Sequence, residues 1–98
     1  MKIKTVGLCE SRQDMPVSEF VYTQVIADPT DTDSLESTAL DFVRAADAEG
    51  FEGVCLYVTG MSVALAAVFK AMSICGWLSF SLMHFDAKTS SYYEQVMW

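Results

Sequence analysis

Residues 54–77 read VCLYVTGMSVALAAVFKAMSICGW, a stretch apolar enough to suggest a membrane span. A transmembrane helix needs about 20 consecutive apolar residues. This window reaches that length only if Gly60 and Gly76 are ignored and Lys70 is accepted near its middle. A lysine at the bilayer centre costs roughly 2.5–3.5 kcal/mol. The glycines instead predict a buried strand, a turn at Thr59-Gly60, and a helix that Gly76 ends.

The helix in this stretch is expected to touch water along one line. Small or polar residues recur at steps of four, four and three, namely Ser62, Ala66, Lys70 and Ser73. The remaining faces are apolar, so the pattern predicts a mostly buried helix with one solvated stripe. The stretch is therefore the central βα unit of a domain that does not enter the membrane.

The residues before this unit predict two strands and a helix. Residues 2–9 and 19–27 are rich in β-branched and aromatic side chains, and a turn at 13–16 makes a hairpin of them plausible. Asp33 with Glu36 matches a capping box for a helix over 34–49. Gly50 fits the position that ends this helix.

Residues 51–59, where the βα unit begins, are almost continuously apolar, as in a central strand covered on both sides.

The residues after the unit predict a second hairpin. Residues 78–85 alternate between two faces, a turn follows, and residues 92–98 return as a final strand. The order β-β-α-β-α-β-β over residues 1–98 predicts a single small α/β domain. Its central strands would be parallel, its edge hairpins antiparallel, and its layers two.

The net charge of the chain, −7, is concentrated in one segment. Residues 28–52 hold eight acidic residues and one arginine, which gives −7, while the acidic and basic residues elsewhere cancel. Direct binding to nucleic acid is not expected, since that affinity comes from lysine and arginine. The acidic helix, with Asp33, Asp41 and Asp47, is a candidate surface for a basic protein partner. The simpler interpretation is a solvated helix face that keeps the protein in solution.

The cysteines Cys9, Cys55 and Cys75 are odd in number and widely spaced. They form neither a disulfide framework nor a zinc motif, so we expect three packed thiols in a reducing cytoplasm. No export signal is visible at the N-terminus. The hydrophobic content of 52% exceeds what one small core needs, which favours a homodimer.

One group of residues is a candidate ligand site. In open α/β sheets, ligands lie beyond the carboxyl ends of the parallel strands. Thr59, Gly60 and Ser62 would lie there at a helix N-terminus that favours anions, beside His84 and Asp86. The competing interpretations are ordinary helix capping for Thr59 and Ser62, and a histidine at the margin of the core that bonds to the backbone or to Asp86. No phosphate-loop motif, nucleophile elbow, metal-ligand spacing or cofactor motif is present.

These observations leave two main hypotheses. The first is a non-enzymatic interaction module, dimeric and acidic on one helix. The second is a small-ligand or nucleotide-binding domain, or a weak enzyme of that type, that uses the turn at 59–62 with His84 and Asp86; an inhibitor that imitates nucleic acid is a lesser option. In size and alternating pattern the chain resembles the small Rossmann-like accessory proteins of microbial mobile or defence systems, some of which bind nucleotides.

Overall fold

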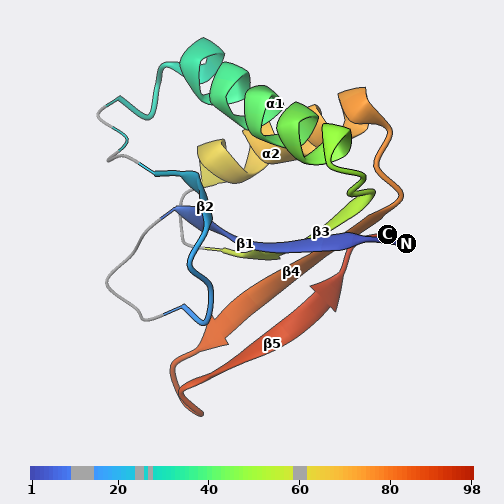
Figure 1. Cartoon of the computed structure of the whole chain (residues 1–98). Coiled ribbons are helices and arrows are strands. Elements are labelled where there is room, and N and C mark those ends of the chain that lie inside the picture. The colour runs from blue at the N-terminus through green and yellow to red at the C-terminus, as the bar shows by residue number, and fades with distance from the viewer. Residues whose placement is uncertain (10–14, 24–25, 27, 59–61) are drawn as a thin grey trace.

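The described residues form five strands and two helices in the predicted order β-β-α-β-α-β-β (Figure 1). The structure is a computed structural model that describes residues 1–9, 15–23, 26, 28–58 and 62–98. The elements are β1 (Ile3–Cys9), β2 (Phe20–Tyr22), α1 (Thr32–Ala48), β3 (Gly53–Tyr57), α2 (Ser62–Cys75), β4 (Ser79–Asp86) and β5 (Ser91–Val96). The α/β class is therefore confirmed, although β2 is much shorter than its predicted segment.

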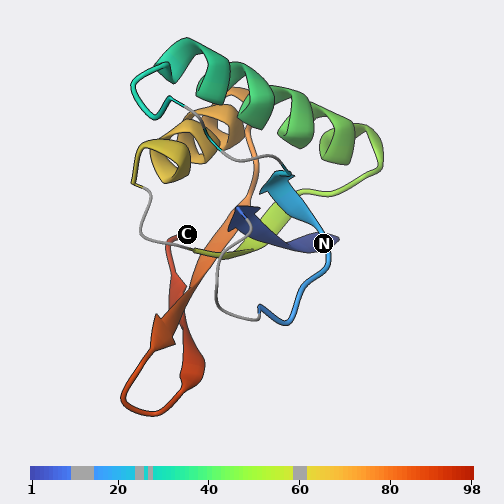
Figure 2. The same cartoon turned by 90° about the vertical axis from the view of Figure 1, so that its left-hand side faces the viewer.

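The strands form one mixed sheet in the order β2-β1-β3-β4-β5. The pairs β1–β2, β1–β3 and β3–β4 are parallel, and β4–β5 is the antiparallel hairpin predicted for this end. The crossovers through α1 and α2 both step across the sheet toward β5. Right-handed crossovers in the same direction place their helices on the same face. Figures 1 and 2 show both helices on one face, so the two-layer arrangement is confirmed.

The N-terminal hairpin predicted from the sequence is wrong, because β1 and β2 run parallel. The described residues before β2 lie beside β1, where the Gly7 N–H donates to the Glu19 carbonyl at 2.9 Å. The connection from β1 to β2 steps away from β5, and its described part, residues 15–19, lies beside Thr5 on the sheet face that the helices leave open. Gly7 permits the close approach, since a Cβ there would lie 2.5 Å from the Phe20 ring.

The core lies between the sheet and the two helices. Alternate strand residues enter it, and they include Val6, Leu8, Val54, Leu56, Phe80 and Leu82, each at most 4% exposed. The buried side of α1 holds Leu35, Ala39, Val43 and Ala46, as predicted. The four residues of the predicted stripe on α2, Ser62, Ala66, Lys70 and Ser73, are all exposed. The exposed side is wider than predicted, because Val63 and Ile74 are exposed as well. Neither described helix is long and apolar enough to cross a membrane.

The N-cap of α1 is Asp31, so the prediction of Asp33 is wrong. The Asp31 carboxylate accepts from the Ser34 N–H at 3.2 Å. The preceding turn explains the earlier start, because Asp28 Oδ1 accepts from both the N–H and the hydroxyl of Thr30, at 2.9 and 2.6 Å. These bonds also lower the pKa of Asp28. Asp33 lies instead in the first turn, where its negative charge interacts favourably with the positive end of the helix dipole.

Gly50 ends α1 as predicted. Its φ is +93°, and its N–H donates to the Asp47 carbonyl at 3.0 Å. The Phe51 N–H donates to the Ala46 carbonyl at 3.1 Å, which completes the glycine-ended motif. Lys2 adds a cation at this end, since its Nζ donates to the Glu49 carbonyl at 3.0 Å. Gly76, at φ +66°, ends α2 with the same pair of bonds.

We expect Gly50→Ala to lower the free energy of unfolding by about 1 kcal/mol. A Cβ at Gly50 would meet nothing within 4 Å, so the loss comes from the positive φ and not from a clash. Gly50→Asn should lose less, because asparagine adopts this conformation more readily than alanine. Urea unfolding of the three proteins tests this, and equal losses for the two variants would contradict the explanation.

Tyr22 connects β2 to α1, and its ionisation should affect stability at high pH. Its hydroxyl donates to the Leu35 carbonyl at 2.8 Å, and the residue is 4% exposed. Burial raises the pKa of Tyr22 to about 12, and the neighbouring Cys9 and Glu36 act in the same direction. The folded state therefore holds this proton more tightly than the unfolded state, so stability is lost as the pH rises from about 10 toward 12.

The variant Tyr22→Phe isolates this effect. At pH 7 it should lower the free energy of unfolding by about 0.5–1.5 kcal/mol, because it removes one hydrogen bond. Between pH 9 and pH 11 the difference in free energy of unfolding between the unmutated protein and the variant should shrink. The unmutated protein has a Tyr22 proton that the unfolded state loses first, whereas the phenylalanine of the variant has no such proton. Denaturant unfolding at the two pH values measures the difference, and a difference that stays constant would argue against this role of Tyr22.

Candidate functional site

The turn after β3 was the centre of the predicted ligand site. Thr59 and Gly60 lie outside the described residues. Ser62 is the exposed first residue of α2, so it lies at a helix N-terminus, as predicted. Directly after β3, the Val58 N–H donates to the Met83 carbonyl at 3.1 Å. The carboxyl end of β3 therefore lies beside the residue that precedes His84 in β4.

His84 lies on the helix side of β4, but its partner is not the predicted one. Its Nε2 lies 2.8 Å from Oε1 of Gln95 on β5, and its ring lies against Tyr93, with centroids 5.3 Å apart and planes at 32°. Because Oε1 of Gln95 can only accept, this contact is a hydrogen bond in the tautomer that carries its proton on Nε2. His84 is half-buried at the margin of the core.

Asp86 is occupied elsewhere, so the predicted orientation of His84 by Asp86 is not formed. Its Oδ1 accepts from the Lys88 N–H at 2.9 Å, which shapes the turn between β4 and β5. The sheet thus brings together His84, Tyr93 and Gln95, and the sequence indicated only the first of them. The β4–β5 register, in which His84 is opposite Tyr93, supplies the other two.

An aromatic cluster occupies the opposite side of the same hairpin. The rings of Tyr57 and Tyr92 lie 4.8 Å apart at 71°, and Phe85 lies 5.3 Å from Tyr92. The Tyr92 hydroxyl is buried without a hydrogen-bond partner among the described residues. Burial raises the pKa of Tyr57, with smaller contributions from Cys55 and Tyr92, which works against Tyr57 as a base. The cluster serves to attach β5 to the sheet.

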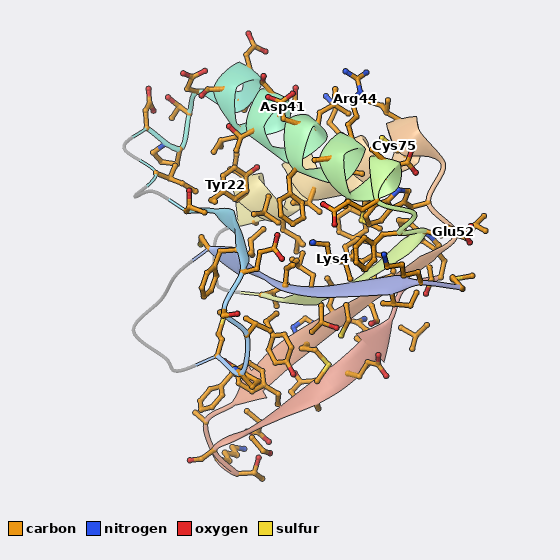
Figure 3. The ribbon with its side chains drawn as sticks, in the orientation of Figure 1. Lys4, Tyr22, Asp41, Arg44, Glu52 and Cys75 are labelled. Carbon is orange, nitrogen blue, oxygen red and sulfur yellow. The ribbon has the colours of Figure 1, made fainter. Side chains whose placement is uncertain are left out.

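A groove of about 600 Å³ lies on the face that the helices leave open. Its lining is Thr5 together with residues 15–19. Glu19 is the titratable residue of that lining, and its carboxylate forms an ion pair with Lys4 at 3.1 Å. In Figure 3, Lys4 lies between α1 and β1, where its Nζ also lies 4.7 Å from the centre of the Phe51 ring. The groove contains none of the predicted site residues and offers little chemistry.

The three acidic residues of the predicted partner surface are all exposed, but they are not equivalent. Asp33 and Asp41 make no ion pair or hydrogen bond with another described residue. Asp47 accepts from Trp77 Nε1 at 3.2 Å, and Trp77 is 6% exposed. Asp47 therefore joins the end of α1 to Trp77, two residues after the end of α2, a structural role that the sequence did not indicate.

The described residues contain no group of three or more possible ligands that could hold a metal ion. Cys9, Cys55 and Cys75 lie on β1, β3 and α2 and form no disulfide with one another. Comparisons of the chain with protein-family models, curated proteins and solved structures found no match. The functional conclusion therefore rests on the geometry and charge of this chain.

Proposed function

We propose that the chain is a small non-enzymatic interaction module that presents the acidic surface of α1 to a basic protein partner. One observation carries the proposal, namely that the described residues outside the segment 28–52 neutralise little of its negative charge. In segment 28–52, which has a net charge of −7, the one ion pair among described residues joins Glu36 to Lys70 at 2.6 Å. Lys4 is paired with Glu19, outside the segment. An uncompensated field of this kind attracts a partner of opposite charge.

The proposed partner surface centres on Asp33 and Asp41. Both carboxylates are exposed and lie on one helix, whereas Asp47 is held by Trp77. Figure 3 shows Arg44 extending from α1 away from the sheet, so one positive charge interrupts the surface. A basic protein fits this pattern, whereas a nucleic acid would be repelled.

The proposal includes a homodimer in the cytoplasm. Large apolar side chains remain exposed on β5 and beside it, with Tyr93 at 55% and Val96 at 69%. Burial of such side chains against a second copy is favourable. The three cysteines form no disulfide with one another, which supports a reducing compartment. The architectural resemblance to accessory proteins extends the proposal to a role in a microbial mobile or defence system.

Neutralising Asp33 and Asp41 should abolish capture of the basic partner. The probe is the full chain, immobilised and exposed to lysate of its source cells at low salt. Asp33→Asn with Asp41→Asn should lose the captured protein, and high salt should release it from the native chain, because surface charges are screened. The matched control, Asp86→Asn with Glu94→Gln, changes the net charge equally on the β4–β5 hairpin. Equal loss in both variants, or in neither, would count against α1 as the partner surface.

The alternative is a small-anion or nucleotide site at the carboxyl ends of β3 and β4. The observation that favours it is the hydrogen bond from Val58 to Met83, since it places the carboxyl end of β3 beside the residue before His84. Ser62, His84 and the N–H groups of the first turn of α2 would then face the same end of the sheet. Asp86 would contribute only through the turn that it stabilises.

A thermal-shift series with phosphate, AMP and ATP tests this alternative. If a ligand binds, the native protein should melt at a higher temperature, by several degrees at saturating concentration. Ser62→Ala and His84→Ala should each reduce that shift, whereas the exposed Ser73→Ala, at the other end of α2, should not. A shift that survives both site variants would exclude this location.

A further inference from the structure

The outer edge of β5 is ready to pair with another strand. β5 is the last strand of the sheet, and no described strand lies on its other side. The Met97 N–H donates to the Phe80 carbonyl, so the period of two directs the N–H groups of Gln95 and Tyr93 toward β4 as well. The backbone groups of Tyr92, Glu94 and Val96 therefore point outward, away from β4.

We propose that two copies of this chain pair antiparallel through β5, with Tyr93 facing Tyr93 of the second copy across a two-fold axis. This inference rests on the homodimer of the proposed function and names its surface and register. The two sheets would join into one continuous sheet, with all four helices on the same side. Pairing would satisfy the outward backbone groups and cover the exposed Tyr93 side chain.

The charge distribution favours this surface for self-association. Residues outside segment 28–52 have no net charge, so two copies meeting at β5 do not repel strongly. Contacts of α1 place it beside β2, at the other edge of the sheet. The two acidic helices would then lie at opposite ends of the dimer. Any interface built on α1 would instead bring like charges together.

Face and charge select the register along β5. In a continuous sheet, a β5 residue on the helix side pairs with a β5 residue on the helix side of the second copy. The two-fold axis therefore passes between two copies of the same residue and not between two different residues. An axis at Glu94 would oppose two carboxylates, whereas an axis at Tyr93 places each Glu94 opposite Tyr92. An axis at Gln95 would bring Met97 into the pairing between the two copies. The strand bulges at Met97, because both Met97 and Trp98 donate to the Phe80 carbonyl, and a bulge disrupts regular pairing.

The other surfaces fit a second copy less well. β2 has three residues, and pairing of β5 with β2 of the next copy would form an open chain without closing. The open sheet face is not flat, because residues 15–19 lie over its β1 side beside Thr5. Figure 2 shows the β4–β5 hairpin projecting from the body of the molecule, which leaves its edge accessible.

Disulfide cross-linking of the full chain tests the register. In the proposed pair, Tyr93 forms no hydrogen bonds across the axis, so the two Cα atoms lie about 4.5 Å apart. That separation lies within the range of a disulfide, so Tyr93→Cys should cross-link to its counterpart under mild oxidation. In the matched control Gln95→Cys, the two cysteines would lie roughly 13 Å apart along the strands and should stay reduced. The native chain, with its own three thiols, controls for other cross-links.

Sedimentation of the native chain separates the two possible failures. A concentration-dependent dimer, with a disulfide between the two copies of position 93 found by peptide mapping of Tyr93→Cys, would support the proposal. A dimer in which Gln95→Cys cross-links instead, or in which neither variant does, would overturn the register and keep the homodimer. A monomer at every concentration would overturn both. A further variant, Glu94→Pro, removes an outward N–H and should weaken the dimer at least tenfold with β4–β5 pairing retained.

Discussion

The handedness of the crossovers is the constraint from which the arrangement follows. The chain steps from β2 through α1 to β3, and from β3 through α2 to β4, in the same direction across the sheet. Since such connections are right-handed, both helices must cover the same face. The connection from β1 to β2 steps the other way, and its described residues 15–19 lie on the opposite face. One rule thus leaves a core on one side of the sheet and an open face on the other.

Features encoded by local pattern could be predicted from the sequence. The stripe from Ser62 to Ser73 requires only the helical period, and its four residues are exposed, although the exposed side of α2 also includes Val63 and Ile74. Gly50 and Gly76 both end helices because each adopts a positive φ, a conformation that glycine tolerates. The C-terminal hairpin follows from alternation and a turn of polar residues. In each case the physical cause lies within a few residues of the effect.

Features that depend on distant residues could not be predicted in this way. A period of two identifies a strand but does not give its direction, so β1 and β2 were predicted to form an antiparallel hairpin. The bond between Asp47 and Trp77 joins residues 30 positions apart, and a charged helix face gives no sign of it. His84 had a nearby acidic residue in the sequence, but the sheet register supplies Gln95 instead. Asp31 and Asp33 both fit the start of α1, and the bonds of Asp28 decide between them.

The separation of charge from the free edge allows the two proposed interactions to coexist. The acidic helix lies over the β2 side of a sheet whose other edge is β5, in a molecule that measures 37 by 34 by 21 Å. At physiological salt, charges are screened over about 8 Å. A basic partner on α1 would therefore have little effect on a contact at β5, and a second copy at β5 would leave α1 exposed. A dimer of this kind presents two acidic surfaces at its ends, so a partner with two basic sites would bind it by avidity.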